Sequence, residues 1–373
     1  IEKDKSNPFF TIDMDKCVLC GICVRTCAEI QGDNAIDYGF RGYDTIITGL
    51  ANEPIAESIC VSCGECVVRC PTGALSINNY LPPAREAKTT CTYCGVGCGL
   101  VLGVRGNQII NVEGDRDNIV NRGHLCVKGR FGFSFVNHKD RLTSPLIKKD
   151  GEFVEATWDQ ALDLVARKLG TYESHQMAVL SSAKITNEDN YIVQKFTRAV
   201  LGTNNIDHCA RLCHAPTVAG LAQSFGSGAM TNSINEIQKC GVMFAIGTNT
   251  TSAHPVIAAK MKEAVRNGGK LIVANPKEIE LCRFADVFLQ HKPGTDVALM
   301  MGLARVILDE GLQDHEFIDG KVENFEAFKE SLKDYDLEFV EETTVVPAQK
   351  IKEAARIYAT YKPGSIFYAM GIT

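Results

Sequence analysis

The sequence has no apolar run of about 18 residues, the length at which a helix can cross a bilayer. Its longest uncharged stretches, 89–104 and 240–259, are interrupted by glycine, threonine, asparagine or proline. Basic charge is also scarce, because the formal net charge is −6 and no basic stripe for nucleic acid is present. The α/β part lacks the GxGxxG pattern of dinucleotide-binding loops. The sequence therefore argues against a membrane span, against nucleic acid as a partner and against nicotinamide binding by this chain.

What the sequence does contain is cysteine. The chain has 373 residues, 45% of them hydrophobic, which is enough for two or three domains with a buried core. Sixteen of the residues are cysteines, too few for a disulfide-dense scaffold, and twelve of these fall into three compact groups. Short fixed intervals indicate thiolate ligands for zinc or iron–sulfur clusters, which are assembled in a reducing compartment. We therefore expect a cytoplasmic protein.

Charge divides the chain unevenly. Residues 1–82 carry eleven acidic and six basic side chains, whereas 83–373 carry 34 and 33. Pro82 and Pro83 break any continuing element, so residues 1–83 are predicted to form an acidic module. Because the sequence begins with Ile1 and ends in an apolar strand-like run at 364–373, we expect it to be part of a longer subunit.

The first two cysteine groups repeat one spacing, C-x2-C-x2-C-x3-C, within 54 residues. In this pattern three cysteines surround one cubane and the fourth reaches the other cluster. The predicted sets are Cys17, Cys20, Cys23 and Cys70 for one cluster, and Cys60, Cys63, Cys66 and Cys27 for the other. A pair of zinc knuckles is disfavoured, because zinc sites use paired C-x2-C spacings. The repeat, with Pro71 after its last cysteine, resembles the bacterial ferredoxin module with two [4Fe-4S] clusters.

The third group has a different spacing and consists of Cys91, Cys94, Cys98 and Cys126. Glycines at 95, 97 and 99 are expected to let the backbone approach a cluster, although zinc stays an alternative on spacing alone. The strings CTYCGVGCGL and CVKGRFG resemble the iron–sulfur domain of the molybdopterin oxidoreductase family. That resemblance implies a third [4Fe-4S] cluster. It also implies that Lys128 lies between this cluster and a pterin, as the cationic bridge for electrons that leave the pterin.

From residue 134 onward, short apolar runs alternate with amphipathic segments, which is typical of an α/β fold. Thr157 and Gln160 form a capping box, and Thr186 or Asn187 caps a second helix. The predicted helices are 157–169, 186–202, 216–225 and 255–266, and the predicted strands are 177–182, which we expect to be buried, 242–247 and 271–275. Ligands of parallel sheets bind beyond the carboxyl ends of the strands, so the loops at 247–254 and 275–277 are the ones to examine.

The family resemblance extends over these loops. The segments 247–255, 273–280 and 292–299 are similar to the guanine-dinucleotide contact loops of the molybdopterin oxidoreductases. The resemblance implies six cofactor contacts, at Asn249, Ser252, Asn275, Lys277, Gly294 and Asp296. Family members often have Asp-Pro-Arg where this chain has Asn-Pro-Lys, and lysine does not reproduce a bidentate arginine clasp. Without the resemblance, these residues read as turn formers and surface charges.

The catalytic candidates are Cys213 and His214, which are predicted to lie just ahead of the helix that begins near Pro216. Helix N-termini favour the thiolate form of a cysteine, and an imidazole can take up a proton near neutral pH. Such a pair alone is more often structural, but this string resembles the formate dehydrogenases of the family, in which a Cys or selenocysteine on molybdenum or tungsten is followed by His. We read the three other cysteines as small core residues, Cys209, Cys240 and Cys282, and assign no role to His208.

The fold expected from this resemblance has a main α/β body with Rossmann-like parallel sheets, an N-terminal α+β ferredoxin-like domain and a small [4Fe-4S] domain. The predicted boundaries are 1–83 for the ferredoxin-like domain, 84–133 for the [4Fe-4S] domain, 134–208 for part of an α/β domain, and 209–373 for an incomplete pterin-binding domain.

The function implied by the resemblance is interconversion of formate and CO2 at a molybdenum or tungsten bis(molybdopterin guanine dinucleotide) site. Cys213 would ligate the metal, His214 would relay the proton, and three [4Fe-4S] clusters would pass electrons to a partner subunit of a hetero-oligomeric complex. That partner is a hydrogenase module, a flavin subunit using NAD(P), or ferredoxin, and we expect it to dock on the acidic module. The alternatives are a molybdenum oxyanion reductase of the nitrate type and an electron-wire subunit of an NADH dehydrogenase-like complex without the metal.

Overall fold

The computed structural model describes residues 2–373, and its contacts divide the chain into two compact units. Unit 1 combines residues 2–133 with 230–372, and unit 2 contains residues 134–229 and Thr373. The division between Phe133 and Ser134 coincides with a predicted domain boundary, whereas the predicted boundary between 208 and 209 falls inside unit 2. Over the described residues, no helix is long and apolar enough to span a membrane.

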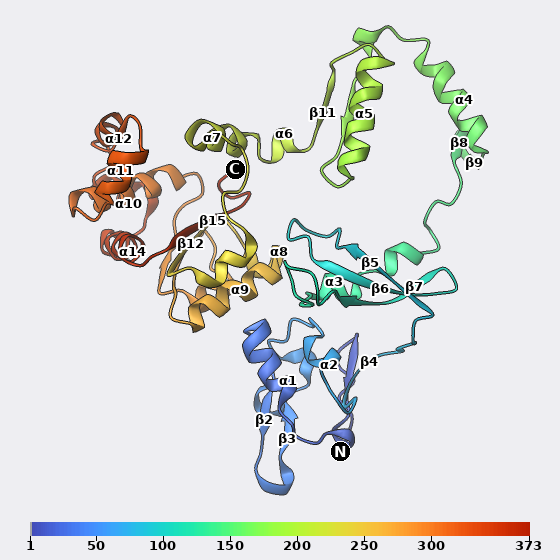
Figure 1. The fold of residues 1–373 in the computed structure, drawn as a ribbon, viewed down its shortest axis with the longest axis horizontal. Helices are drawn as coiled ribbons and strands as arrows, with labels where there is room; N and C mark the ends of the chain where they lie inside the picture. The colour runs from blue at the N-terminus through green and yellow to red at the C-terminus, as the bar shows by residue number, and fades with distance from the viewer. Residues whose placement is uncertain (1) are drawn as a thin grey trace. The chain divides into compact units, whose positions relative to one another are not determined.

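The N-terminal part of unit 1 consists of short elements around a small apolar core (Figure 1). They are β1 (Phe10–Ile12), α1 (Ile22–Arg25), a π-helical turn (Thr26–Gln31), β2 (Asp37–Gly39), β3 (Ile46–Thr48), α2 (Glu65–Val68) and β4 (Leu75–Ile77), with 3₁₀ turns at Met14–Lys16, Gly42–Asp44, Leu50–Asn52 and Ile55–Glu57. β1 pairs antiparallel with β4, and β2 with β3. Both short helices follow a glycine in the left-handed region, Gly21 with φ of 70° and Gly64 with φ of 75°. The two cysteine repeats therefore share one local backbone design.

A three-stranded antiparallel sheet follows in the order β5-β6-β7. Its elements are β5 (Arg85–Thr90), β6 (Gly99–Arg105) and β7 (Gln108–Gly114), and the helix α3 (Val127–Phe131) comes after them. The β6–β7 turn places Gly106 and Asn107 at φ of 54° and 63°, the positive values that suit the twist of a tight hairpin. Val96, Leu100 and Leu125 are buried in the core of this domain together with Cys98.

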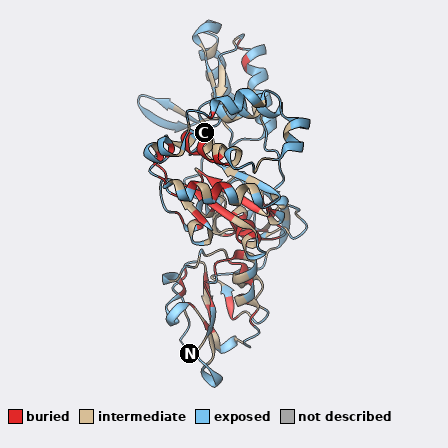
Figure 2. Cartoon of the chain, turned by 90° about the vertical axis from the view of Figure 1, so that its left-hand side faces the viewer, coloured by how far each residue is buried: buried red, intermediate tan, exposed pale blue. Residues whose placement is uncertain are grey.

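The rest of unit 1 is built on a parallel sheet in the order β14-β13-β12-β15. The strands are β12 (Val242–Ile246), β13 (Lys270–Ala274), β14 (Val287–Leu289) and β15 (Gly364–Tyr368). All five residues of β12 are buried, since its side chains alternate between two apolar cores. Figure 2 shows this concentration of buried residues in the strands. Strand 242–246 and the segment 270–274 confirm the strands predicted at these positions.

Helices cover both faces of this sheet (Figure 1). They are α8 (Thr250–Ala253), α9 (Pro255–Arg266), α10 (Asp296–Asp309), α11 (His315–Lys321), α12 (Phe325–Ser331), α13 (Leu337–Thr344) and α14 (Ala348–Thr360), with 3₁₀ turns at Ile234–Lys239 and Glu280–Phe284. One core contains Leu299 of α10 and Ala354 of α14, and the other contains Met261 of α9. The bounds of α9 confirm the predicted helix 255–266.

Unit 2 consists of a hairpin, four helices and a two-stranded parallel sheet. Its elements are β8 (Leu146–Lys149), β9 (Glu152–Glu155), α4 (Trp158–Leu169), β10 (Val179–Ser181), α5 (Asn187–Ala199), β11 (Ile206–His208), α6 (Ala210–Cys213) and α7 (Ala215–Phe225), with 3₁₀ turns at Ser134–Asn137 and Ser174–Gln176. Thr157 caps α4 with the predicted capping box, and Thr186, one of the two predicted caps, is the N-cap of α5. The prediction that 177–182 is a buried strand is wrong, because Leu180 is 86% exposed. Its strand pairs only with β11, so the two-stranded sheet has too few neighbours to cover both faces.

Candidate functional site

The first of three cysteine sites, site one, is a hollow of about 300 Å³. It is lined by Cys17, Cys20, Cys23 and Cys70, together with neighbouring apolar residues. The backbone N–H of Leu19 donates to the Sγ of Cys17 at 3.4 Å, and that of Leu75 donates to the Sγ of Cys70 at 3.4 Å. The loop lies at the surface, with Cys20 exposed and Val18 66% exposed.

Site two is a hollow of about 440 Å³. It is lined by Cys27, Cys60, Cys63 and Cys66, one cysteine of the first repeat and three of the second. The N–H of Ala35 donates to the Sγ of Cys27 at 3.2 Å, and that of Ser62 donates to the Sγ of Cys60 at 3.4 Å. Burial raises the pKa of Cys66 well above its ordinary value.

Site three is a hollow of about 320 Å³. It is lined by Cys91, Cys94, Cys98 and Cys126, and also by Pro255 and Val256 at the start of α9. Burial raises the pKa of Cys98 to about 12. Of the nearby glycines, Gly97 adjoins open space, but a Cβ at Gly99 would lie 2.5 Å from the side-chain nitrogen of Asn118. Gly99 is therefore required by its packing against Asn118, in addition to any approach to a cluster.

The donor chemistry of the three hollows fits iron–sulfur clusters. Each hollow gathers four thiols, and burial raises the pKa of Cys23 to about 11, so a bare thiolate is unfavourable there without a compensating metal. N–H donors to sulfur, as at sites one and two, are a common environment of such clusters. Within residues 2–373, no three His, Cys, Asp or Glu side chains are arranged as ligands of one metal ion. The ligand sets themselves stay predictions.

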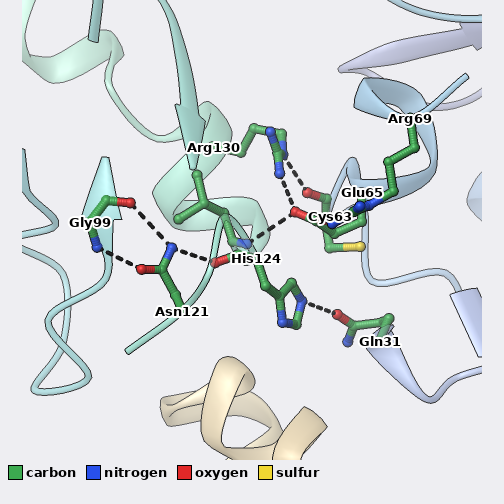
Figure 3. A network of polar contacts seen from close by, with 9 residues as sticks. Gln31, Cys63, Glu65, Arg69, Gly99, Asn121, His124 and Arg130 are labelled. Carbon is green, nitrogen blue, oxygen red and sulfur yellow. Dashed lines mark hydrogen bonds and ion pairs between the residues drawn. The ribbon is translucent and has the colours of Figure 1, made fainter. Parts of the chain in front are cut away.

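A buried polar network lies beside site two and reaches α3 (Figure 3). Glu65 is its centre, because one carboxylate oxygen accepts from Arg130 and from the N–H of Leu125 at 3.1 Å, while the other accepts from Arg69 at 3.1 Å. Glu65 and Arg130 are each 1% exposed. Removal of either partner of such a buried ion pair strongly destabilises the fold, because the other charge stays buried without a partner.

The same network contains a neutral histidine. The Nε2 of His124 lies 3.0 Å from the Oε1 of Gln31, and burial lowers the pKa of His124 to about 4. The amide of Asn121 donates to the carbonyl oxygens of Gly99 at 3.2 Å and His124 at 2.9 Å. Sequence reasoning missed this network. One signal was available, since Arg130 lies in α3, four residues after a predicted ligand, Cys126, which is the N-cap of that helix.

The N-terminal module also contacts the parallel-sheet part of unit 1 through charged groups. Lys262 of α9 is 3% exposed and pairs with Asp33, and its Nζ lies 3.2 Å from the Oε1 of Glu280. Arg266 donates to the carbonyl oxygen of Glu29 at 2.5 Å. These contacts hold α9 against the segment that follows Cys27.

Lys128 connects the cysteine region to a predicted cofactor loop. Its Nζ donates to the carbonyl oxygen of Ser252 at 3.3 Å. Lys128 and Ser252 also line one hollow of about 760 Å³ together with Cys63 of site two and Cys126 of site three. The structure thus brings a predicted electron-transfer lysine, two sets of cysteines and one predicted pterin contact together within unit 1.

The predicted cofactor contacts gather at one edge of the parallel sheet. Ile246, Ala274 and Leu289, the last residues of β12, β13 and β14, are aligned by the strand register. The six candidate residues follow these strands and are Asn249, Ser252, Asn275, Lys277, Gly294 and Asp296. A hollow of about 860 Å³ at this edge is lined in part by Lys292 and Lys350. Exposed loops, lysines and helix N-termini at the carboxyl edge fit the phosphates of a nucleotide-bearing cofactor.

Two of these candidates have structural partners. The side chain of Asn275 donates to the carbonyl oxygen of Thr248 at 3.3 Å and accepts from the N–H of Lys277 at 3.1 Å, so it holds two of the loops together. Asp296 lies 2.9 Å from the Nε2 of buried His291. Asn249, Ser252, Lys277 and Gly294 are exposed.

Cys213 and His214 belong to unit 2 and lie just ahead of α7, as predicted. Cys213 is also the last residue of α6, because its N–H donates to the carbonyl oxygen of Cys209 at 2.9 Å. His214 lies between α6 and α7 and is the residue at the N-terminus of α7, which ends before Gly226 as predicted. Cys213 is half-buried and His214 is exposed. The pair is therefore accessible at the junction of two helices.

The remaining cysteines divide into two kinds. Cys240 is buried and Cys282 packs against the same core, as predicted. Cys209 is exposed, so its prediction as a core residue is wrong. It precedes α6 at the surface of unit 2, where its Sγ accepts from the N–H of Ala183 at 3.3 Å. His208, the last residue of β11, is exposed as well.

Comparison with known families gives three matches along the chain. Residues 141–372 match the family described as molybdopterin oxidoreductase, residues 84–138 match its Fe4S4 domain, and residues 16–74 match a 4Fe-4S dicluster domain. The first match covers more than half of the chain. The chain therefore belongs to the molybdopterin oxidoreductase family, with mixed α/β content and iron–sulfur domains, which confirms the resemblance predicted from the motifs.

Relatives with curated names point to one activity. The F420-dependent formate dehydrogenase 2 subunit alpha of Methanococcus maripaludis is 45% identical over 76% of this chain and 42% of its own length. The corresponding subunit of Methanocaldococcus jannaschii is 46% identical over the same shares. A putative formate dehydrogenase of Staphylococcus haemolyticus is 35% identical over 100% of this chain and 43% of its own length. The chain spans less than half the length of these relatives.

A solved structure similar to this chain has another name. Acetylene hydratase from Pelobacter acetylenicus matches with a TM-score of 0.68 and 28% identity, over 77% of this chain and 40% of that one. The fold is therefore shared with a protein whose name describes no formate chemistry. The reaction must be argued from the site residues and not from the fold.

Proposed function

We propose that this chain belongs to the catalytic subunit of a formate dehydrogenase, which interconverts formate and CO2 with transfer of two electrons. The relatives named formate dehydrogenase support the substrate, and the adjacent Cys213 and His214 match the resemblance to those enzymes. One structural observation carries the redox part of the proposal. Lys128, two residues after Cys126 of site three, donates to the carbonyl oxygen of Ser252 in a predicted cofactor loop, which supports a route between the two regions.

The proposed cofactors are a molybdenum or tungsten bis(molybdopterin guanine dinucleotide) and three [4Fe-4S] clusters, one for each cysteine site. The bound metal centre supplies the two-electron redox chemistry. Cys213 ligates the metal, and the exposed imidazole of His214 holds and releases the proton at a ring nitrogen. Lys128 provides the positive charge beside the electron route. The guanine-dinucleotide contacts are those predicted at the carboxyl edge of the sheet.

The proposed electron path runs from site three through site two to site one. Cys63 and Cys126 line one hollow, which supports direct neighbourhood of sites two and three. Site one is the outlet, because its Cys20 is exposed and the surrounding loop carries the apolar side chains of Val18 and Leu19 at the surface. An acidic module with an exposed outlet is suited to a protein partner.

The partner subunit is proposed to be a hydrogenase module, a flavin subunit using NAD(P), or ferredoxin. Because two relatives are named F420-dependent, F420 is a further acceptor to test. Assembly of thiolate-bound clusters in a reducing compartment supports a cytoplasmic location.

The test is formate-driven reduction of a viologen dye under anaerobic conditions by the full protein. The wild type should contain molybdenum or tungsten and turn over, and Cys213→Ala should lose turnover by at least about 10³-fold, as expected for a group at the reacting centre. Cys209→Ala, an exposed cysteine four residues earlier, is the matched control and should keep wild-type rates. Metal without formate turnover would favour an oxyanion reductase. Intact clusters without metal or turnover would favour the electron-wire subunit.

A further inference from the structure

Arg130 hydrogen-bonds to a cysteine of each of two sites. Its backbone N–H donates to the carbonyl oxygen of Cys126 at 3.0 Å, and its Nε donates to the carbonyl oxygen of Cys63 at 2.8 Å. Cys126 lines site three and Cys63 lines site two. A single buried residue therefore connects the walls of the two hollows, and Figure 3 shows Arg130 beside Cys63 and Glu65.

The guanidinium of Arg130 is fixed in place by its surroundings. Its Nη2 pairs with a carboxylate oxygen of Glu65. A Cβ at Gly64 would lie 2.6 Å from the Cδ of Arg130 and 3.0 Å from its Nε, so the arginine occupies the space left by the missing side chain. Gly64 lines site two. The positive charge therefore lies directly against the backbone that forms the wall of site two.

One N–H group of this arginine lacks an acceptor. Among the described residues, the Nη1 of Arg130 is one of two buried side-chain atoms without a hydrogen-bond partner. Buried donors are nearly always paired, so an orphaned one indicates an acceptor that protein atoms do not supply. The orphaned donor lies on the same guanidinium whose Nε is bonded to the carbonyl oxygen of Cys63, a residue that lines site two.

We infer that the buried positive charge of Arg130 raises the reduction potential of the cluster in site two. The inference rests on the proposed function for the presence of that cluster. Reduction adds one electron to the cluster, so a buried cation at the wall of the site stabilises the reduced form. Glu65 lowers the potential by the same argument, because it is a buried carboxylate beside the same cluster. The paired charges together set how readily site two accepts an electron from site three.

An EPR-monitored redox titration of the full protein tests the inference, with the site-two signal identified by its loss in Cys66→Ala. Arg130→Gln should lower the midpoint potential by at least 59 mV, a tenfold change in the ratio of reduced to oxidised cluster. Glu65→Gln should raise it. Opposite directions are the signature of charge, since general loosening of the fold would move both variants the same way. Arg130→Lys, which keeps the charge, should shift the potential less than Arg130→Gln and carries the test if the glutamine variant fails to fold.

Arg69→Gln is the matched control. Arg69 pairs with the other oxygen of Glu65, but its side chain is 33% exposed, so solvent screens the lost charge and the shift should be smaller. The site-one signal serves as an internal reference and should not move. An unchanged site-two potential in Arg130→Gln, or equal shifts in the Arg130 and Arg69 variants, would overturn the inference. A wild type without the site-two signal would contradict the proposed cluster instead, so the two failures are distinguishable.

Discussion

Sites one and two come from the same repeated motif but have opposite surroundings. Both place a glycine with positive φ before a short helix, and both gather four cysteines around one hollow. Site one lies under an exposed loop, whereas site two has the buried pair of Glu65 and Arg130 at its wall. The spacing of a motif thus determines its donor set, and the neighbouring residues determine what the site does. An exposed site suits exchange with a partner, and a buried one suits transfer inside the chain.

The largest difference between the sites should appear when the buried pair is broken. Glu65→Ala leaves Arg130 as an uncompensated buried charge and removes the acceptor of the Leu125 N–H, so we expect the free energy of unfolding to fall by about 3–5 kcal/mol. Lys16→Ala, beside site one, removes a side chain that is 59% exposed and should unfold like the wild type. Denaturant unfolding followed by cluster absorbance measures both. If the two variants lost equal free energy of unfolding, the buried pair at site two would contribute no more to stability than the exposed lysine at site one.

Gly21 and Gly64, which precede the equivalent helices at sites one and two, allow a second comparison of the two sites. Gly21→Ala places a side chain in the left-handed region and against the hydroxyl of Tyr38, a partly exposed group that can move, so a loss of about 1–2 kcal/mol is expected. Gly64→Ala has the same backbone strain and also pushes on the fixed side chain of Arg130, which raises the expected loss to about 2–4 kcal/mol. Thermal unfolding of both variants tests the order. A larger loss for Gly21→Ala would mean that Arg130 is free to move.

The role of site one as the outlet predicts a kinetic difference. Val18→Asp adds a charge to a side chain that is 66% exposed on the site-one loop, so the KM for the natural protein acceptor should rise about tenfold, equivalent to about 1.4 kcal/mol of binding. Reduction of a small viologen should change less than about twofold, because the dye needs no docking surface. Phe317→Asp, at a 59% exposed position on α11, is the control and should leave both rates unchanged. An equal rise in KM for Phe317→Asp would place the docking surface elsewhere.

The cysteine sets and the strand–helix–strand unit around α9 could be predicted because their signals are local. Cysteine spacing, Pro255 at a helix start and the apolar run of β12 each identify an element without knowledge of its neighbours. The family followed from the strings around the third cysteine group and was confirmed by comparison. Local signals failed where coverage by other elements decides burial. Leu180 and Cys209 were expected inside and are exposed, since unit 2 supplies few elements to cover them.

The network at site two could not be predicted, because it depends on contacts between distant parts of the sequence. Glu65 and Arg130 are 65 positions apart, and in the sequence they read as ordinary surface charges. The short helix α6 before Cys213 was missed for a similar reason. Pro216 correctly predicted the start of α7, but the turn that makes Cys213 the end of α6 depends on a bond back to Cys209, which no residue type signals.

The smallest expected effect is the acid sensitivity of site one. Lys3 donates to Asp13 at 2.8 Å, and this hydrogen bond outweighs burial, so the pKa of Asp13 lies below its ordinary value. A carboxyl group with a lower pKa in the folded state stabilises the fold above its unfolded pKa of about 3.9, and this contribution is lost as the pH falls through the lower folded value. Because Asp13 caps the start of the 3₁₀ turn that leads to Cys17, the site-one EPR signal should decay before the site-two signal as the pH is lowered below about 4.

Asp13→Asn removes this carboxylate, so the site-one EPR signal should already be smaller at neutral pH. The signal should also fall less steeply as the pH is lowered. Asp44→Asn, an exposed carboxylate on a 3₁₀ turn of the same module, is the control and should leave the acid dependence as in the wild type. Cluster signals recorded by EPR across the pH range measure both. Simultaneous decay of the two sites in the wild type would mean that acid acts on the module as a whole, and that burial at site two gives its cluster no separate protection.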